Sequence, residues 1–100
     1  MITYIDIIVE QVMNECKIKN RDLAKLYALL VLTKGNSITL KDVHDAWAMN
    51  MNFRNITDKC YGHEHKSIIP FNELPIEIQN KDQRFVNSLI KIANDNNIKI

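Results

Sequence analysis

Cysteine and glycine are both scarce in this 100-residue chain, which has two of each. Cys16 and Cys60 lie far apart and form no Cys-x-x-Cys pair, so they do not build the disulfide framework of a small secreted domain. We expect two free thiols in a reducing compartment. Neither Gly35 nor Gly62 lies in a glycine-rich phosphate loop, which excludes nucleotide sites of that class.

A dominant charge is also missing, because 13 basic residues balance 12 acidic ones to a net charge of +1. Proteins that bind nucleic acid polymers usually concentrate basic residues on one face, so we expect no such partner. The chain lacks the basic start and apolar run of a signal peptide. No apolar run approaches the roughly 18 residues of a membrane span. We therefore expect a cytoplasmic protein with no membrane partner.

What the chain does have is an ordinary globular composition, with 46% hydrophobic and 25% charged residues. Its length allows one domain, residues 1–100, with one modest core. Isoleucine, asparagine and lysine are abundant, a bias that we associate with AT-rich genomes. The composition thus hints at a low-GC bacterium or its phage.

Hydrophobic periodicity predicts a mainly α fold of about four helices. In residues 4–17 the apolar positions Ile5, Ile8, Val9, Val12 and Cys16 recur at steps of three and four. Asn20 can cap a second helix over residues 21–34, and Gly35 can end it. The apolar run 26–32 inside this helix is also compatible with a strand.

The second half of the chain is predicted to hold two helices separated by a long loop. Thr39 and Asp42 resemble a capping box that opens a helix over residues 40–52, with an apolar stripe of Leu40, Val43, Trp47 and Met51. Residues 53–69 lose all periodicity and are expected to form the loop. Pro75 begins a last helix over residues 75–94, and residues 95–100 either fray or form a short strand. Its core-facing positions are Ile78, Phe85, Val86, Leu89 and Ala93.

His44 and Trp47 stand three residues apart on the third predicted helix and therefore share a face. One interpretation is structural, with a core tryptophan beside a hydrogen-bonded histidine. The other is functional: Trp47 or a neighbour forms the apolar floor of a pocket and His44 lies at its rim. The sequence leaves both open.

The predicted loop combines cations with rings. Arg54, Lys59 and Lys66 surround Tyr61, His63 and His65. Cations bind phosphate and rings stack on a flat base, so this mixture suits an anionic, flat ligand. The alternative is a solvated basic loop without a ligand.

Metal and catalytic sites are less favoured by the same loop. Cys60, His63 and His65 offer zinc ligands, but Cys-x-x-His-x-His lacks the second ligand pair of a structural finger. A Cys60 nucleophile with either histidine would lack an evident oxyanion donor. We therefore expect no metal, no cofactor and no enzymatic activity.

Three segments with fixed spacing resemble the ryanodine-receptor repeat (RyR) domain. They are residues 43–48 (Val-His-Asp-Ala-Trp-Ala), 65–75 (His-Lys-Ser-Ile-Ile-Pro-Phe-Asn-Glu-Leu-Pro) and 79–82 (Gln-Asn-Lys-Asp). The resemblance covers about residues 40–95 and leaves residues 1–36 as an N-terminal helical extension. One departure is the loop, where the family's Gly-Trp pair is replaced at best by Tyr61-Gly62.

The resemblance implies a non-catalytic module that binds a nucleotide-derived small molecule. For a free-standing copy, it suggests a phage sponge that sequesters a cyclic nucleotide or an ADP-ribose-type immune signal in the host cytoplasm. The expected ligand-binding residues are His44, Trp47, Arg54, Lys59, Tyr61, His65 and Lys66. A homo-oligomer would enclose the ligand between chains. The alternative is a protein-interaction or structural module with no small ligand, which uses the first two helices as its surface.

Overall fold

The computed structural model describes residues 1–57 and 68–99, and for residues 54–57 it describes the backbone only. Within these ranges all regular structure is helical and there is no strand, which confirms the predicted mainly α fold. The described chain contains four long helices, α1 (Tyr4–Cys16), α2 (Arg21–Lys34), α3 (Leu40–Thr57) and α5 (Gln83–Asp95). The shorter elements are η1 (Gly35–Ser37), η3 (Phe71–Glu73), α4 (Ile76–Gln79) and η4 (Asn80–Asp82).

The bounds of α2 match the prediction because its local signals are strong. The Asn20 side chain accepts a hydrogen bond from the Leu23 amide at 3.1 Å, and this caps the helix start. Gly35 follows the helix with φ 55°, in the region that favours glycine. The run 26–32 is helical rather than extended, with Tyr27 and Val31 buried and Leu29 exposed.

The start of α3 was predicted correctly and its end was not. Thr39 and Asp42 form a reciprocal capping box, in which each backbone amide donates to the other side chain, at 3.0 and 3.2 Å. The helix then continues to Thr57, although residues 53–69 were expected to form a loop. Phe53, the last residue of α3 whose side chain is described, is exposed, so the apolar stripe does not continue to it. Residues 53–57 also contain no glycine or proline to stop a helix.

The single last helix predicted over residues 75–94 is divided in the structure. Pro75 precedes the short helix α4, and the 3-10 turn η4 separates α4 from α5. Asn80 and Asp82 lie in this turn, and such short polar side chains compete with helical backbone bonding. After α5, the described tail forms no strand, and the Ile98 amide donates to the Ala93 carbonyl at 2.8 Å.

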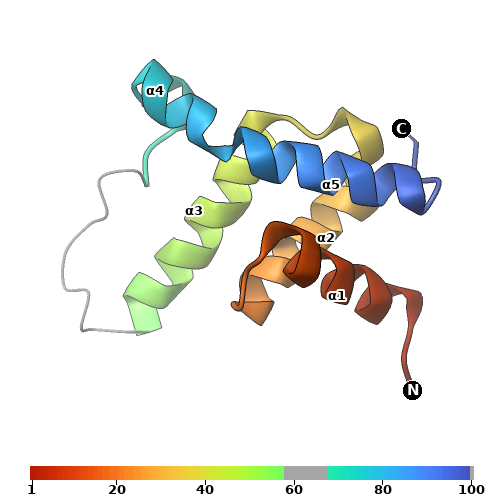
Figure 1. Ribbon diagram of the computed structural model, residues 1–100. Coiled ribbons are helices and arrows are strands. Elements are labelled where there is room, and N and C mark those ends of the chain that lie inside the picture. Colours follow the sequence, from red (N-terminus) through yellow and green to blue (C-terminus); the bar gives the residue numbers. More distant parts are fainter. Residues whose placement is uncertain (58–67, 100) are drawn as a thin grey trace.

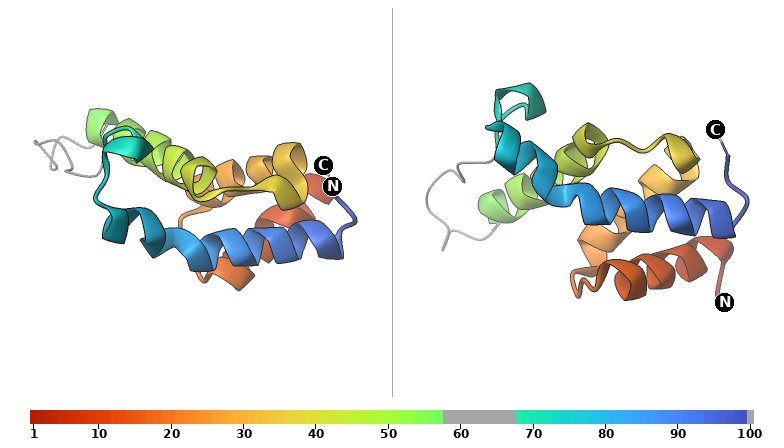
Figure 2. Two further views of the ribbon diagram at one scale, coloured as in Figure 1. Left: turned by 90° about the horizontal axis from the view of Figure 1, so that it is seen from above. Right: turned by 45° about the horizontal axis from the view of Figure 1, so that its top comes forward.

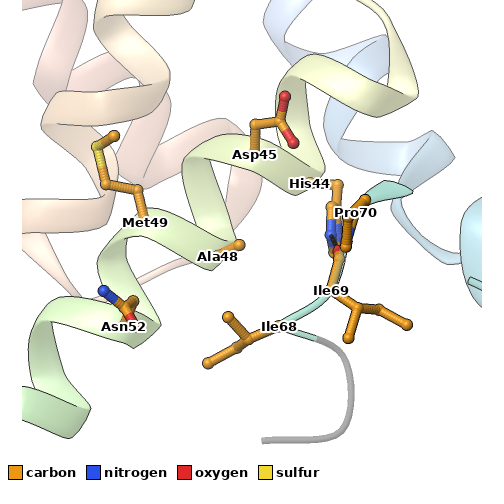
Figure 3. Close-up of a pocket in the computed structure, with 8 residues that line it drawn as sticks. All are labelled: His44, Asp45, Ala48, Met49, Asn52, Ile68, Ile69 and Pro70. Atoms are coloured by element: carbon orange, nitrogen blue, oxygen red, sulfur yellow. Dashed lines mark hydrogen bonds between the residues drawn. The ribbon is translucent and has the colours of Figure 1, made fainter. Parts of the chain in front are cut away.

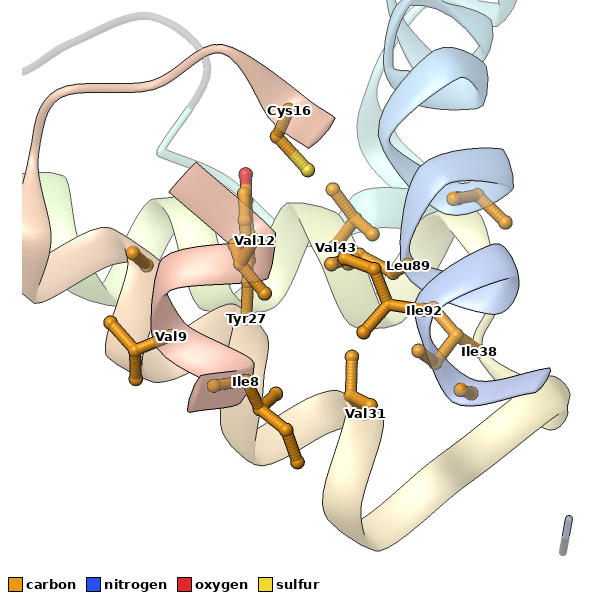
Figure 4. Packing of buried hydrophobic residues seen from close by; sticks show 14 residues of the cluster. Ile8, Val9, Val12, Cys16, Tyr27, Val31, Ile38, Val43, Leu89 and Ile92 are labelled. Carbon is orange, nitrogen blue, oxygen red and sulfur yellow. The ribbon is translucent and has the colours of Figure 1, made fainter. Parts of the chain in front are cut away.

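The core lies where α1, α2 and α5 pack together and the first turns of α3 join them (Figure 1). Figure 4 shows the side chains of this cluster converging from the four helices. Its most completely buried large residues are Tyr27, Leu89, Ile92, Val12, Val31, Val43 and Cys16. Ile5 was expected among them but is exposed on α1.

The two chain termini lie at one end of the molecule, and the distal part of α3 and α4 lie at the other (Figures 1 and 2). The same separation is visible in both views of Figure 2. No helix in the described ranges has the length and apolar character needed to cross a membrane. The fold thus places His44 in the first turns of α3, beside the core.

Candidate functional site

His44 joins two distant parts of the chain. Its side chain is buried, at 4% exposure, and its Nε2 lies 2.8 Å from the Ile69 carbonyl oxygen. A carbonyl only accepts hydrogen bonds, so Nε2 carries the proton and donates it. The bond holds the segment 68–70 against α3, although Ile69 lies 25 residues after His44 in the sequence.

Two aromatic rings flank the His44 imidazole. The ring centroids of Trp47 and Phe71 each lie 5.9 Å from the imidazole centroid, in tilted arrangements. Trp47 is half-buried. His44 and Trp47 therefore do share a face, and His44 has the hydrogen-bonded, structural environment that the first interpretation described.

A groove runs beside this cluster, between α3 and residues 68–70 (Figure 3). It has a volume of about 370 Å³ and is open to solvent. Its lining is mainly apolar: Ala48, Met49, Ile68, Ile69 and Pro70. His44, Asp45 and Asn52 supply the polar groups. His44 thus lies at the edge of a hollow while it fastens one wall, which combines features of both interpretations.

The segment after the groove is held by Gln79. The Gln79 side-chain amide donates to the Phe71 carbonyl at 3.2 Å and to the Leu74 carbonyl at 3.0 Å. Leu74 itself is buried. These bonds fix the turn that carries Pro70 and thereby the position of one groove wall.

The charges at the groove are mostly neutralised within the chain. Asp45 forms an ion pair with Lys41 at 2.6 Å, and this hydrogen bond raises the pKa of Lys41. Behind His44, burial raises the pKa of the Asp82 carboxyl, while the charges of His44 and Arg84 oppose that shift. The described lining contains no lysine or arginine. Its described part therefore offers no cation to bind a phosphate.

The predicted ligand-binding residues fall into two groups. His44 and Trp47 lie together next to the groove. The Arg54 side chain and the whole of Lys59, Tyr61, His65 and Lys66 lie outside the described residues. The zinc and nucleophile alternatives rest on Cys60, His63 and His65, which lie outside them too. Where the structure does describe side chains, no group of three metal-ligating residues gathers.

Sequence reasoning missed the apolar lining. Met49 lies one turn after Asp45 and off the stripe that Leu40, Val43 and Trp47 form on α3. An exposed apolar side chain outside the core stripe is the signal that could have found it. Ile69 and Pro70 gave no such signal, because they lie beside α3 through contacts between distant residues, such as the bond from His44.

The chain matches the model of the family described as "Domain of unknown function (DUF7701)" over residues 3–94, and it belongs to that family. No curated protein and no solved structure matches it. The resemblance to the RyR domain is therefore wrong, because the matching family is a different one that also takes in α1 and α2. Pro70, Leu74 and Pro75, which carried much of the resemblance, have local roles in a turn and a helix start.

Proposed function

We propose that this protein is a non-catalytic binding module that holds apolar side chains of a protein partner in the groove between α3 and residues 68–70. The observation that carries the proposal is the groove's lining, in which Met49, Ile68 and Ile69 leave apolar surface open to solvent. A preformed apolar hollow with a few polar groups is the usual form of a binding site. Methionine adapts its shape readily, which suits contact with varied side chains.

A protein partner fits this groove better than an anionic small molecule. The described lining carries one acid, Asp45, and no lysine or arginine. A phosphate in the groove would meet the Asp45 carboxylate, whereas an apolar side chain would pack against Met49 and Ile69. Protein partners bury apolar side chains in such hollows at the centre of their interfaces.

A nucleotide-derived ligand is the second candidate. The observation in its favour is that Asn52 and Asp45 offer hydrogen-bonding groups beside an apolar wall, which suits the edge and face of a base. Its phosphates would depend on Arg54, Lys59 and Lys66, as the sequence suggested. Sequestration of a phage-defence signal belongs to this candidate and loses the support of the RyR resemblance.

The non-catalytic part of the proposal rests on how His44 is used. Its Nε2 is occupied by the Ile69 carbonyl, so this nitrogen is not available as a general base.

The proposed location is the cytoplasm. Two cysteines that lie far apart in the sequence and the balanced charge support this location.

A peptide library selected against the wild-type protein tests the leading proposal. We expect peptides rich in apolar residues to bind wild type and to fail against Met49→Lys, which places a charge in the groove. The matched control is Ile76→Lys, an exposed isoleucine on α4 outside the groove, which should bind like wild type. Trp47 is the only tryptophan, so its fluorescence reports binding near His44. Equal binding by all three proteins would refute the proposal.

Calorimetry with cyclic di- and trinucleotides and cyclic ADP-ribose isomers tests the second candidate. Binding that weakens in Lys66→Ala and Arg54→Ala would favour it over a protein partner. Recovery of unaltered ligand after heat denaturation would distinguish binding from turnover. Silence across the panel at high protein concentration removes this candidate.

A further inference from the structure

Helix α1 begins with large apolar side chains that the core does not bury. Ile8, Val9 and Val12, further along the helix, are buried in the core. The α1 surface, as we call it, consists of the large apolar side chains exposed at and before the first turns of α1: Met1, Ile2, Tyr4, Ile5 and Ile7. Ile2 is 79% exposed and Tyr4 66%. Exposed apolar side chains gathered in this way indicate contact with another molecule.

The α1 surface has the relief of a self-complementary contact. Ile7 borders two hollows, of about 320 and 480 Å³, and so forms a ridge between them. Tyr4 and Leu32 line the first hollow, and Ile2 and Gln11 line the second. A ridge beside a hollow lets two copies of one surface interlock, as side chains do when helices pack ridge into groove.

The charges beside the α1 surface also favour a second copy. Asp6 and Glu10 lie on α1, whereas Arg21 and Lys25 lie on the adjoining α2. Glu10 forms an ion pair with Arg21. Acidic and basic groups therefore lie together at one edge of the α1 surface and carry no net charge. A second copy can approach this surface without net like-charge repulsion.

The apolar area is of the size that a dimer requires. Burying one large apolar side chain removes on the order of 100 Å² from water, so five partly exposed ones offer roughly 400 Å². A standard interface buries about 800 Å² per partner, of which about 57% is apolar. The α1 surface supplies nearly all of that apolar share, which is more than a small ligand needs.

We propose that two copies of this chain associate through the α1 surface around a two-fold axis. The proposal does not depend on the groove, whose lining residues on α3 and in 68–70 include none of the α1 surface. The dimer and the groove's ligand can therefore be tested separately.

Sedimentation velocity of the full chain across a concentration series tests the dimer. We expect wild type to be dimeric at micromolar concentration and Ile7→Asp to raise the dissociation constant at least about 10-fold. The control is Ile76→Asp, which changes an exposed isoleucine on α4 outside the α1 surface and should match wild type. Circular dichroism checks that Ile7→Asp remains folded. A monomeric wild type, or an Ile7→Asp variant as dimeric as wild type, would overturn the proposal.

A charge exchange tests association through the α1 surface even if Ile7→Asp fails to fold. Glu10→Arg gives the edge of this surface an excess of positive charge and Arg21→Glu an excess of negative charge, so each variant should repel its own copy and be monomeric. Mixed together they should form a heterodimer, because the two surfaces then carry opposite charges. A mixture that stays monomeric contradicts the arrangement. Binding of monomeric wild type to phosphatidylcholine vesicles would instead assign the surface to lipid and overturn the proposal.

Discussion

The imidazole of His44 and the backbone carbonyl of Ile69 are joined by a 2.8 Å hydrogen bond between residues 25 positions apart. This bond joins the two walls of the groove, since His44 lies on α3 and Ile69 lies in the segment before η3. The rings of Trp47 and Phe71 each lie 5.9 Å from the imidazole as well.

His44→Ala should therefore destabilise the protein by about 2–4 kcal/mol, because it removes a buried ring and leaves the Ile69 carbonyl without its donor. Urea unfolding followed by circular dichroism measures the loss. His44→Gln keeps a donor at a similar position and should lose less. If both variants unfold like wild type, the bond does not hold the groove.

Gln79→Ala should cost about 1–2 kcal/mol, because its amide supplies two hydrogen bonds to the turn at Phe71 and Leu74. Gln83→Ala is the matched control, since Gln83 makes one exposed bond to Asn87. Urea unfolding of the two variants should separate them clearly. Equal losses would show that the turn is held by packing alone.

Asp82→Asn should be more stable than wild type near neutral pH. Burial raises the pKa of Asp82 above 3.8, so the folded state disfavours its charged form. The contribution of Asp82 to the free energy of unfolding is fully present below pH 3.8, where its carboxyl is protonated. This contribution is lost as the pH rises through the raised pKa of Asp82 in the folded state. Melting temperatures of both proteins from pH 3 to pH 7 should converge at the acidic end. If the melting temperature of Asp82→Asn exceeded that of wild type by more at pH 3 than at pH 7, the prediction would be wrong.

Cys16 should be inert toward thiol reagents in the folded protein. Its side chain is 1% exposed, and burial raises the pKa of the thiol to about 11. In a Cys60→Ser variant, Cys16 should not react with a chromogenic disulfide reagent at pH 8 until urea unfolds the protein. Rapid reaction without urea would mean that α1 separates from the core far more readily than its packing indicates.

Local signals in the sequence were enough to predict much of the fold. The caps at Asn20, Gly35 and Thr39 fixed three helix ends, because each satisfies backbone groups within a few residues. The predicted end of α3 fell too early because the apolar stripe stops before Phe53, which is exposed, while the helix itself continues to Thr57. The η4 turn was missed because Asn80–Asp82 contains neither glycine nor proline.

The candidate site was harder to predict because it depends on contacts between distant residues. The proximity of His44 and Trp47 follows from helical spacing, and the structure contains it. Ile69 and Pro70 reach the groove through contacts between distant residues, including a bond to a residue 25 positions earlier, which periodicity does not encode. The same lack of long-range information made a short residue pattern resemble another family.

The groove and the α1 surface lie toward opposite ends of the molecule. Two chains joined at their α1 surfaces would therefore point their grooves outward. A partner with two copies of the bound segment could engage both grooves, and the second binding would proceed at a high effective concentration. Avidity of this kind exceeds single-site affinity by roughly 10²–10⁴-fold. A shallow groove that binds one segment weakly could thus hold a repeated or multimeric partner tightly.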